Sequence, residues 1–265
     1  MTDPSKNDRV EPHPILPAYY DGREQRRAFV RDLFDEAAPH YDRLNEVFSF
    51  GTGARYRREC LVRAGLHPGL RVVDIAVGTG LVAREAVAIT GKEGDIIGVD
   101  VSAGMLAVAR SKLGIHLIQG AAEQLPLADS TMDFLTMGYA LRHVSDLRSA
   151  FGEFHRVLRP GGIALVLEIG RPTNRLSRAL VTSYLGGLVP FLSRWTAGRN
   201  VTGKLMHYYW DTIKYCIAPD AIMDAMRESG FVDTSCTTEL DVFRSYRCQK
   251  AADTAVSAPP RSTVG

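Results

Sequence analysis

The feature that most constrains this chain is a short apolar segment that runs into an acid and then a glycine turn, at residues 72–80. Asp74 closes the apolar run, and Gly78 and Gly80 form the turn. Glycine adopts the positive φ angles that a tight turn needs and places no side chain between the backbone and a ligand. Residues 81–90 are compatible with a helix, whose first turn would present unpaired N–H groups. The segment therefore predicts a strand, a loop and a helix that together bind a small molecule.

Two ligands fit such a turn, a dinucleotide and S-adenosylmethionine (SAM). The spacing Gly78-x-Gly80-x-x-Ala83 matches the dinucleotide pattern, and Asp100 follows at about the expected 20 residues. However, Asp74 at the strand end would repel a pyrophosphate, whereas it would attract the sulfonium and ammonium groups of SAM. The remainder of the chain also shows no clear second catalytic domain. These two features favour SAM.

A second acid ends another apolar strand, expected at residues 95–100. Short strands that are apolar throughout are typical of a parallel sheet covered on both faces. At the carboxyl end of such a strand, Asp100 can accept hydrogen bonds from both ribose hydroxyls of an adenosyl group. The alternative is that Asp100 binds no ligand and only interacts favourably with the positive end of the dipole of the next helix. Ser102 is expected to cap that helix, which would bury Met105 and run to Leu113.

Strands and helices alternate along the middle of the chain. We expect further strands at residues 115–119, 132–137 and 163–168, helices at 145–158 and 219–229, and two closing strands at 231–238 and 240–249. This alternation predicts a parallel sheet with helices on both faces, and the closing pair predicts an antiparallel hairpin at one edge. The expected fold class is therefore α/β, a doubly wound, mostly parallel, seven-stranded Rossmann-like sheet with helical lid elements.

The composition indicates which kinds of partner and which cellular compartment fit this chain. The 265 residues carry 32 basic and 30 acidic side chains, a formal net charge of +2, which gives no support for a nucleic-acid partner. The four cysteines are scattered and form no Cys-x-x-Cys pair. They therefore predict neither a metal site nor a disulfide framework, and they fit a reducing, cytoplasmic compartment.

The chain is expected to form one catalytic domain between two polar ends. Residues 1–22 are expected to be a flexible arm, residues 23–250 the folded domain, and residues 251–265 a disordered tail. No segment is long and apolar enough to span a bilayer. The apolar stretch 179–193 is expected to form lid core; alternatively, it admits a prenyl tail or touches a membrane surface.

Several motifs of this chain resemble the motifs of a single protein family. They are Tyr41-Asp42-Arg43-Leu44-Asn45, Ser49-Phe50-Gly51, the turn at 74–80, Ala122-Glu123-Gln124-Leu125-Pro126, Leu141-Arg142, the run from Arg156 to Gly162, and Leu167-Glu168 with Arg171-Pro172. Together they resemble class I SAM-dependent methyltransferases, of the family that C-methylates ubiquinone and menaquinone precursors. The resemblance covers residues from about 34 to 250. The first motif and Leu141-Arg142 are its family-specific part.

The resemblance implies a methyltransferase with SAM as cofactor. The residues implied to bind SAM are Asp74, Ala76, Gly78, Thr79, Gly80, Asp100, Met105, Ala121, Ala122 and Gly138. The acceptor implied is a small molecule, a prenylated quinol or quinone precursor. Two alternatives are a methyltransferase of secondary metabolism with another acceptor and a non-catalytic protein of this fold. The oligomeric state stays open, with a homodimer compatible.

The chain departs from the family pattern at four places. Ala121 stands where the family usually has Asp or Asn, and His143 stands where it has Asn. Residues 239–244 replace a glycine-rich turn and a histidine, and residues 186–207 are altered. All but the first fall where an acceptor would lie, so they concern the acceptor rather than the reaction class.

Catalytic candidates follow from the chemistry of the acceptor. A ring carbon attacks a sulfonium methyl only when the ring is electron-rich, as it is after a hydroxyl loses its proton. Arg142 could stabilise the phenolate and His143 could accept the proton, with activity falling below a pH near 6.5. The alternatives are a salt bridge from Arg142 to Glu168 and a surface position for His143. Tyr41 is expected to line the pocket and Asp42 to order a lid helix over the turn; simple helix packing is the alternative.

Overall fold

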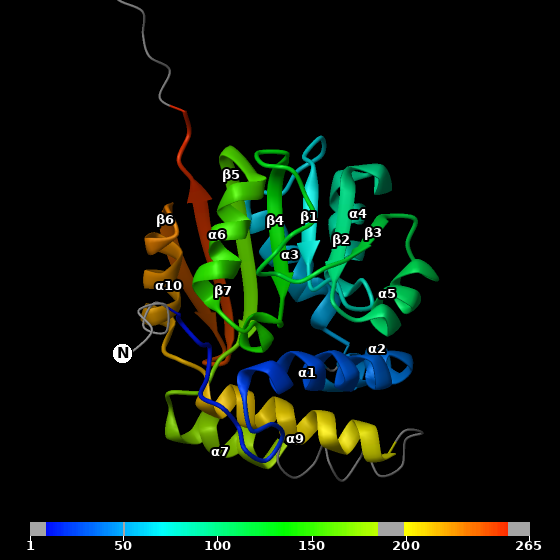
Figure 1. Cartoon of the computed structure of the whole chain (residues 1–265), viewed down its shortest axis with the longest axis vertical. Helices are drawn as coiled ribbons and strands as arrows, with labels where there is room; N and C mark the ends of the chain where they lie inside the picture. Colours follow the sequence, from blue (N-terminus) through cyan, green and yellow to red (C-terminus); the bar gives the residue numbers. More distant parts are fainter. Residues whose placement is uncertain (1–8, 50, 185–198, 254–265) are drawn as a thin grey trace, which may run out of the picture.

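A mixed seven-stranded sheet forms the centre of the molecule (Figure 1). The computed structural model describes residues 9–49, 51–184 and 199–253. The strands are β1 (Val72–Ile75), β2 (Ile96–Asp100), β3 (His116–Gln119), β4 (Met132–Gly138), β5 (Leu158–Ile169), β6 (Phe231–Glu239) and β7 (Phe243–Lys250). Their order in the sheet is β3-β2-β1-β4-β5-β7-β6. The first five strands are parallel, and β7 and β6 add the predicted antiparallel pair. The predicted fold class is confirmed.

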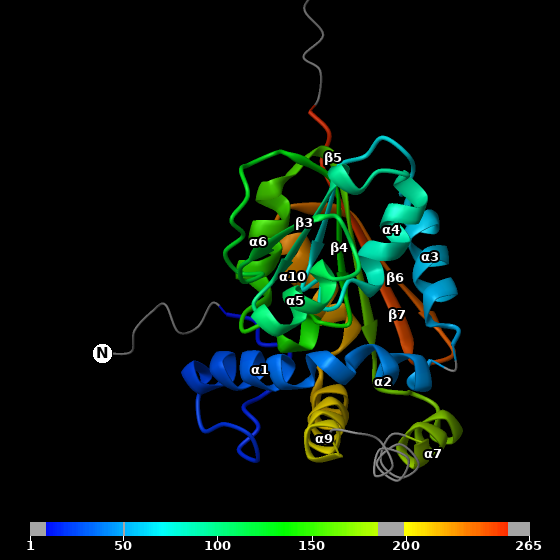
Figure 2. The same cartoon turned by 90° about the vertical axis from the view of Figure 1, so that its right-hand side faces the viewer.

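Helices cover both faces of the sheet and one of its ends. They are α1 (Arg23–Ala37), η2 (Ala38–His40), α2 (Tyr41–Phe48), α3 (Gly53–Ala64), α4 (Leu81–Thr90), η3 (Glu93–Asp95), α5 (Ala103–Arg110), η4 (Leu141–His143), α6 (Leu147–Val157), α7 (Arg175–Ser183), α9 (Arg199–Tyr215) and α10 (Pro219–Glu228). Figure 2 shows α3 and α4 on one face and α6 and α10 on the other. α1, α2, α7 and α9 lie across the end of the sheet where the parallel strands finish. We refer to these four helices as the cap. Among the described helices, none has the length and hydropathy that crossing a membrane requires.

Helix α6 illustrates how the sequence fixes an element to the sheet. Its Leu147, Phe151 and Phe154 are buried, and their spacing places them on one face of the helix. The carboxylate of Asp146 caps the helix by accepting a hydrogen bond from the backbone N–H of Arg148 at 3.2 Å. Losing one buried phenylalanine ring costs about 3–5 kcal/mol, so this apolar face determines how α6 packs on the sheet.

Several predicted boundaries differ from the structure. The helix expected to reach Leu113 ends at Arg110, and the helix expected from residue 145 begins at Leu147. The strand expected at residues 163–168 starts earlier, at Leu158, because Leu158 already pairs with Met132 of β4. The glycines that follow Pro160 therefore lie inside β5 and do not precede it.

The amino-terminal arm is partly ordered, contrary to the expectation for residues 1–22. In its described part, the side chains of His13, Leu16 and Tyr20 are buried. The hydroxyl of Tyr19 donates a hydrogen bond to Asp211 of α9 at 2.8 Å. Leu16 and Tyr20 belong to the apolar core between α1 and α9. The polar, proline-containing composition of the arm concealed these few anchoring side chains.

Candidate active site

The loops after the parallel strands enclose a cavity of about 110 Å³, which we call the strand-end cavity. It lies where the strand order reverses between β1 and β4, the usual ligand position in doubly wound sheets. Its wall includes Ala76 and Gly78 after β1, Asp100 at the end of β2, Ala122 after β3, and Gly138 at the end of β4. Helices α1 and α2 complete the wall from the cap side.

The structure brings together six of the ten residues predicted to bind the cofactor. The six that line the strand-end cavity are Ala76, Gly78, Asp100, Met105, Ala122 and Gly138. The other four, which do not line it, are Asp74, Thr79, Gly80 and Ala121. Thr79 and Gly80 shape the turn, with Gly80 at a φ of 89°. Ala121 bridges to Gln124 within its loop.

Asp100 organises the glycine turn as well as lining the cavity. One carboxylate oxygen accepts a hydrogen bond from the backbone N–H of Gly78 and the other from that of Ser102, both at 2.8 Å. Burial raises the pKa of Asp100 to about 6, with the charge of Asp35 adding to this shift and the two N–H groups opposing it. A ligand that donates hydrogen bonds to this carboxylate would favour its charged form.

Asp74 lies outside the wall of the strand-end cavity. It is buried at the end of β1, and neither carboxylate oxygen has a hydrogen-bond partner among the described residues. Burial raises the pKa of Asp74 well above its usual range, and the charge of Arg57 opposes this shift. The contact between Asp74 and the cationic end of a ligand therefore stays a prediction.

Helix α2, predicted to act as a lid, packs over the turn. Asp42 of α2 accepts hydrogen bonds from the hydroxyl of Thr79 and from the ammonium of Lys112. Asp35 of α1 accepts from the hydroxyl of Ser102 at 2.5 Å and from the backbone N–H of Gly104 at 2.8 Å. The amino-terminal helices are therefore fastened to the turn after β1 and to the start of α5.

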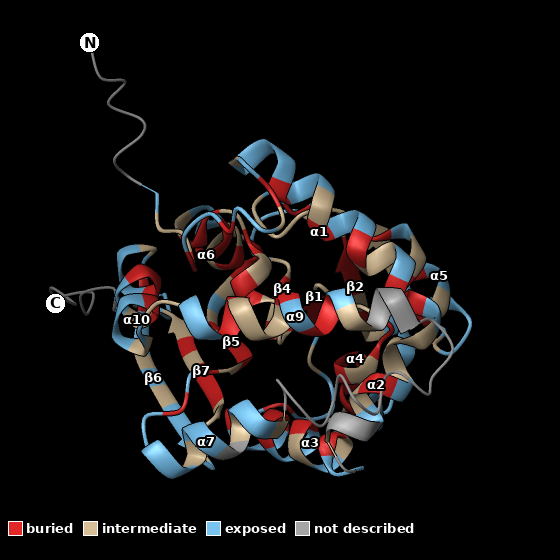
Figure 3. Ribbon diagram, turned by 90° about the horizontal axis from the view of Figure 1, so that it is seen from below, coloured by how far each residue is buried: buried red, intermediate tan, exposed pale blue. Residues whose placement is uncertain are grey.

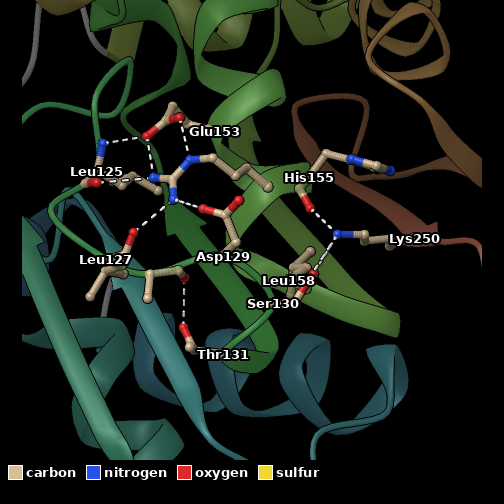
Figure 4. Close-up of polar contacts among 11 residues, drawn as sticks. Leu125, Leu127, Asp129, Ser130, Thr131, Glu153, His155, Leu158 and Lys250 are labelled. Carbon is tan, nitrogen blue, oxygen red and sulfur yellow. Dashed lines mark hydrogen bonds and ion pairs between the residues drawn. The ribbon is translucent and has the colours of Figure 1, made fainter.

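A network around Arg156 explains why two of the quoted motifs occur together. Its guanidinium donates to the carbonyl of Leu127 at 2.7 Å and to that of Leu125 at 3.1 Å. It also contacts Asp129 at 2.6 Å and Glu153 at 2.7 Å (Figure 4). The loop between β3 and β4 is thereby tied to α6. This loop carries Ala122 and Glu123 in the wall of the strand-end cavity, and the role of Glu123 there was not predicted.

A second cavity of about 250 Å³, the cap cavity, lies between the cap and the sheet. Seen onto this end of the molecule, α9 lies across the strand ends, with α1 on one side and α3 and α7 on the other (Figure 3). The wall is rich in aromatic side chains, including Tyr56, Tyr209, Trp210 and Phe243. The cap cavity offers an apolar aromatic environment, which suits a flat apolar ring.

Tyr41 and Tyr139 line both cavities. The prediction that Tyr41 lines the pocket is thus in accord with the structure, and its hydroxyl accepts a hydrogen bond from that of Tyr209 at 3.1 Å. Tyr139 was missed, although it directly follows Gly138; its φ of 60° is unusual for a residue with a side chain. The two cavities are therefore neighbours separated by tyrosine side chains.

Arg142 does not have the free charge expected of a phenolate-binding residue. Its guanidinium forms an ion pair with Glu168, and both side chains are at most 2% exposed. Its Nε donates to the hydroxyl of Thr212 at 3.1 Å, and the guanidinium lies 5.0 Å from the centroid of the Tyr209 ring. The alternative weighed from the sequence, a salt bridge to Glu168, is the arrangement found. Arg142 joins the end of β4 to β5 and α9.

His143 lies among aromatic rings in the wall of the strand-end cavity. Its ring stacks on Tyr208 and Tyr209, with centroids 5.3 and 5.7 Å away, and meets the edge of Phe34 at 5.2 Å. Both ring nitrogens are buried without a hydrogen-bond partner among the described residues. Burial, followed by the charge of Arg142, lowers the pKa of His143 well below 6.5. This burial argues against the activity limb near pH 6.5 that was expected from this residue.

We expect His143 to leave no titration in the activity profile between about pH 5.5 and 8, because its folded pKa is far below its usual value near 6.5. The rate at saturating SAM should be measured against pH for the parent enzyme and for His143→Asn. The two profiles should have the same shape, whatever the change in absolute rate. A limb near pH 6.5 that disappears in His143→Asn would contradict the depressed pKa and restore the role of this side chain as a titrating base.

Comparison with known proteins agrees with this geometry. The profile of the ubiE/COQ5 methyltransferase family matches residues 20–238. The demethylmenaquinone methyltransferase of Symbiobacterium thermophilum is 34% identical over 220 residues, which cover 80% of this chain and 88% of that protein. The ubiquinone/menaquinone biosynthesis C-methyltransferase UbiE of Pseudomonas entomophila is 33% identical over 241 residues, covering 87% and 92%.

A solved structure supports the fold. A SAM-dependent methyltransferase from Thermotoga maritima, described as a possible histamine N-methyltransferase, matches with a TM-score of 0.57 at 23% identity, covering 83% of this chain and 99% of that one. The match of the family profile over most of the chain confirms the resemblance drawn from the motifs. The chain therefore belongs to the ubiE/COQ5 methyltransferase family and is a SAM-dependent methyltransferase.

Proposed function

We propose that this enzyme transfers the methyl group of SAM to a ring carbon of a prenylated quinol, a precursor in quinone biosynthesis. The names of the relatives in Symbiobacterium and Pseudomonas support a quinone-type acceptor. The observation that carries the proposal is the aromatic, largely apolar cap cavity beside the strand-end cavity, with Tyr41 and Tyr139 in both walls. A ring held in the cap cavity would face the cofactor across these tyrosines.

The strand-end cavity has groups that fit SAM. Asp100 offers a carboxylate for the ribose hydroxyls, and Met105 offers an apolar surface for the adenine. The lid contacts of Asp42 and Asp35 would hold the turn and α5 around the nucleoside. Bound SAM supplies an electrophilic methyl group. The protein then contributes chiefly by orienting the acceptor ring and excluding water, effects that together can supply much of the rate.

The prenyl tail gives a direct test of the acceptor. Val181 and Tyr184, from the apolar stretch 179–193, line the cap cavity; residues 185–193 lie outside the described residues. Each buried methylene contributes about 0.8 kcal/mol, so one isoprene unit should raise kcat/KM well over tenfold relative to a tail-less naphthoquinol. Formation of S-adenosylhomocysteine measures both rates. Equal efficiencies would favour the alternative, a methyltransferase of secondary metabolism with another acceptor. A cytoplasmic or membrane-peripheral location and a homodimer stay predictions from the sequence.

A further inference from the structure

The charges in the wall of the cap cavity do not balance. Three charged side chains line it, Arg57, Arg142 and Glu239. Arg142 is paired with Glu168, and Glu239 is paired with Arg63 at 2.7 Å. Arg57 is the remaining one, and the structure gives it neither an ion pair nor a hydrogen bond with any described residue; its Nε is buried without a partner. Among the described residues, the wall therefore carries one positive charge that has no ion-pair partner.

Arg57 is held in place by its surroundings on α3. The residue is 6% exposed, and a guanidinium does not lose its proton in proteins. A methyl group added at Gly53 would lie 3.2 Å from Nη1 of Arg57, so the guanidinium packs closely on the first residue of α3. Burying an unpaired charge is unfavourable, because the charge loses its hydration. Such a cost is usually offset by a partner, which points to an anion that binds in the cap cavity.

The field of Arg57 reaches the boundary between the two cavities. Burial raises the pKa of Tyr139, and the charge of Arg57 acts against this shift. Tyr139 lines both cavities, so Arg57 lies close enough to act on a ring oxygen placed beside Tyr139. The acid that also senses this charge is Asp74, but the oxygens of Asp74 have no hydrogen-bond partner among the described residues.

We propose that Arg57 binds the ionised ring oxygen of the acceptor, a phenolate or quinolate, and so takes the role first assigned to Arg142. This inference rests on the proposed function. The acceptor hydroxyl gives its proton to water, and the oxyanion feeds electron density into the ring. The ring carbon forms a bond to the methyl carbon, and the electron pair of the S–C bond goes to sulfur. The methylated carbon then loses its proton to water, which restores the aromatic ring.

A chromogenic phenol tests the inference without methyl transfer. We would titrate 4-nitrophenol by absorbance when it is bound to the enzyme saturated with S-adenosylhomocysteine. The bound probe should have a pKa below that of the free probe. Arg57→Met should remove this difference, and Arg57→Lys should keep part of it. Arg55→Met is the matched control, because Arg55 lies on the same helix with its side chain 84% exposed and paired with Glu59.

Turnover separates Arg57 from a structural role. With a quinol acceptor, Arg57→Met should lower kcat/KM by about 10²-fold, as the loss of one oxyanion-stabilising group does, while the dissociation constant for SAM stays within about twofold. A bound-probe pKa that is unchanged in Arg57→Met would overturn the proposal. A loss of SAM affinity without a loss of kcat/KM for the acceptor would also overturn it, because Arg57 would then act on cofactor binding through Asp74.

Two further outcomes are decisive. If Arg57→Met does not fold, the parent enzyme can be tested alone. It should bind 4-nitrophenolate more tightly than 4-nitroanisole, which has no ionisable hydroxyl. The absence of such a preference at alkaline pH would overturn the proposal. If the probe pKa is lowered but no prenylated quinol is methylated, the phenolate site stands and the proposed quinol substrate fails.

Discussion

Asp100→Ala should weaken SAM binding at least tenfold while the protein stays folded. Asp100 lines the strand-end cavity, where its carboxylate can accept hydrogen bonds from the ribose hydroxyls. Each such charge-assisted bond is worth about 1.5–3 kcal/mol. The dissociation constant should be measured by calorimetry, with Asp224→Ala on α10 as a control, since Asp224 is exposed and pairs only with nearby Arg227. An unchanged dissociation constant would remove Asp100 from the site.

The same carboxyl predicts how SAM affinity depends on pH. Its folded pKa is about 6, above the usual 3.8, so the unliganded protein takes up a proton as the pH falls through 6. This protonation stabilises the unliganded fold, because the buried charge is removed. SAM bound through its hydroxyls needs the charged form, so its affinity should fall about fivefold between pH 6 and pH 5. Asp100→Asn should abolish this dependence.

The second large effect is expected at the ion pair of Arg142 and Glu168. Arg142→Met leaves a carboxylate buried without its cation, which typically costs about 3–5 kcal/mol of stability. The free energy of unfolding in urea should fall by this amount. The double substitution Arg142→Met with Glu168→Gln removes both charges and should recover at least half of the loss. A single substitution that costs less than about 1 kcal/mol would mean that the pair is not as desolvated as the structure shows.

The loss of stability in Arg142→Met should also be separable from any effect on catalysis. Arg142 is fully engaged by Glu168 and Thr212, so the double variant should retain SAM binding once it is folded. If the double variant is as stable as the parent enzyme yet loses acceptor turnover, Arg142 touches the acceptor after all. That result would weaken the assignment of the oxyanion to Arg57.

The sequence by itself determined the strands of the sheet and the glycine turn that follows β1. The helix expected at residues 81–90 has these same bounds in the structure, and Ser102 and Asp146 cap their helices as their side chains predict. These features depend on neighbours a few positions away, through apolar periodicity, caps and glycines with positive φ. The carboxyl ends of parallel strands share one edge, so the acid that ends β2 could also be placed in the site.

Only the tertiary structure decided which charges are free. Arg142 and Arg57 look alike in the sequence, but Arg142 meets Glu168 from a strand 26 positions away, whereas Arg57 forms no ion pair with a carboxylate of the described residues. His143 loses its expected pKa because Tyr208 and Tyr209, from a distant helix, bury its ring. Desolvation and ion pairing depend on which side chains the fold brings together across the sheet and the cap. Residues nearby in the sequence do not identify those neighbours. The roles of Arg57, Arg142 and His143 could therefore be assigned only from the fold.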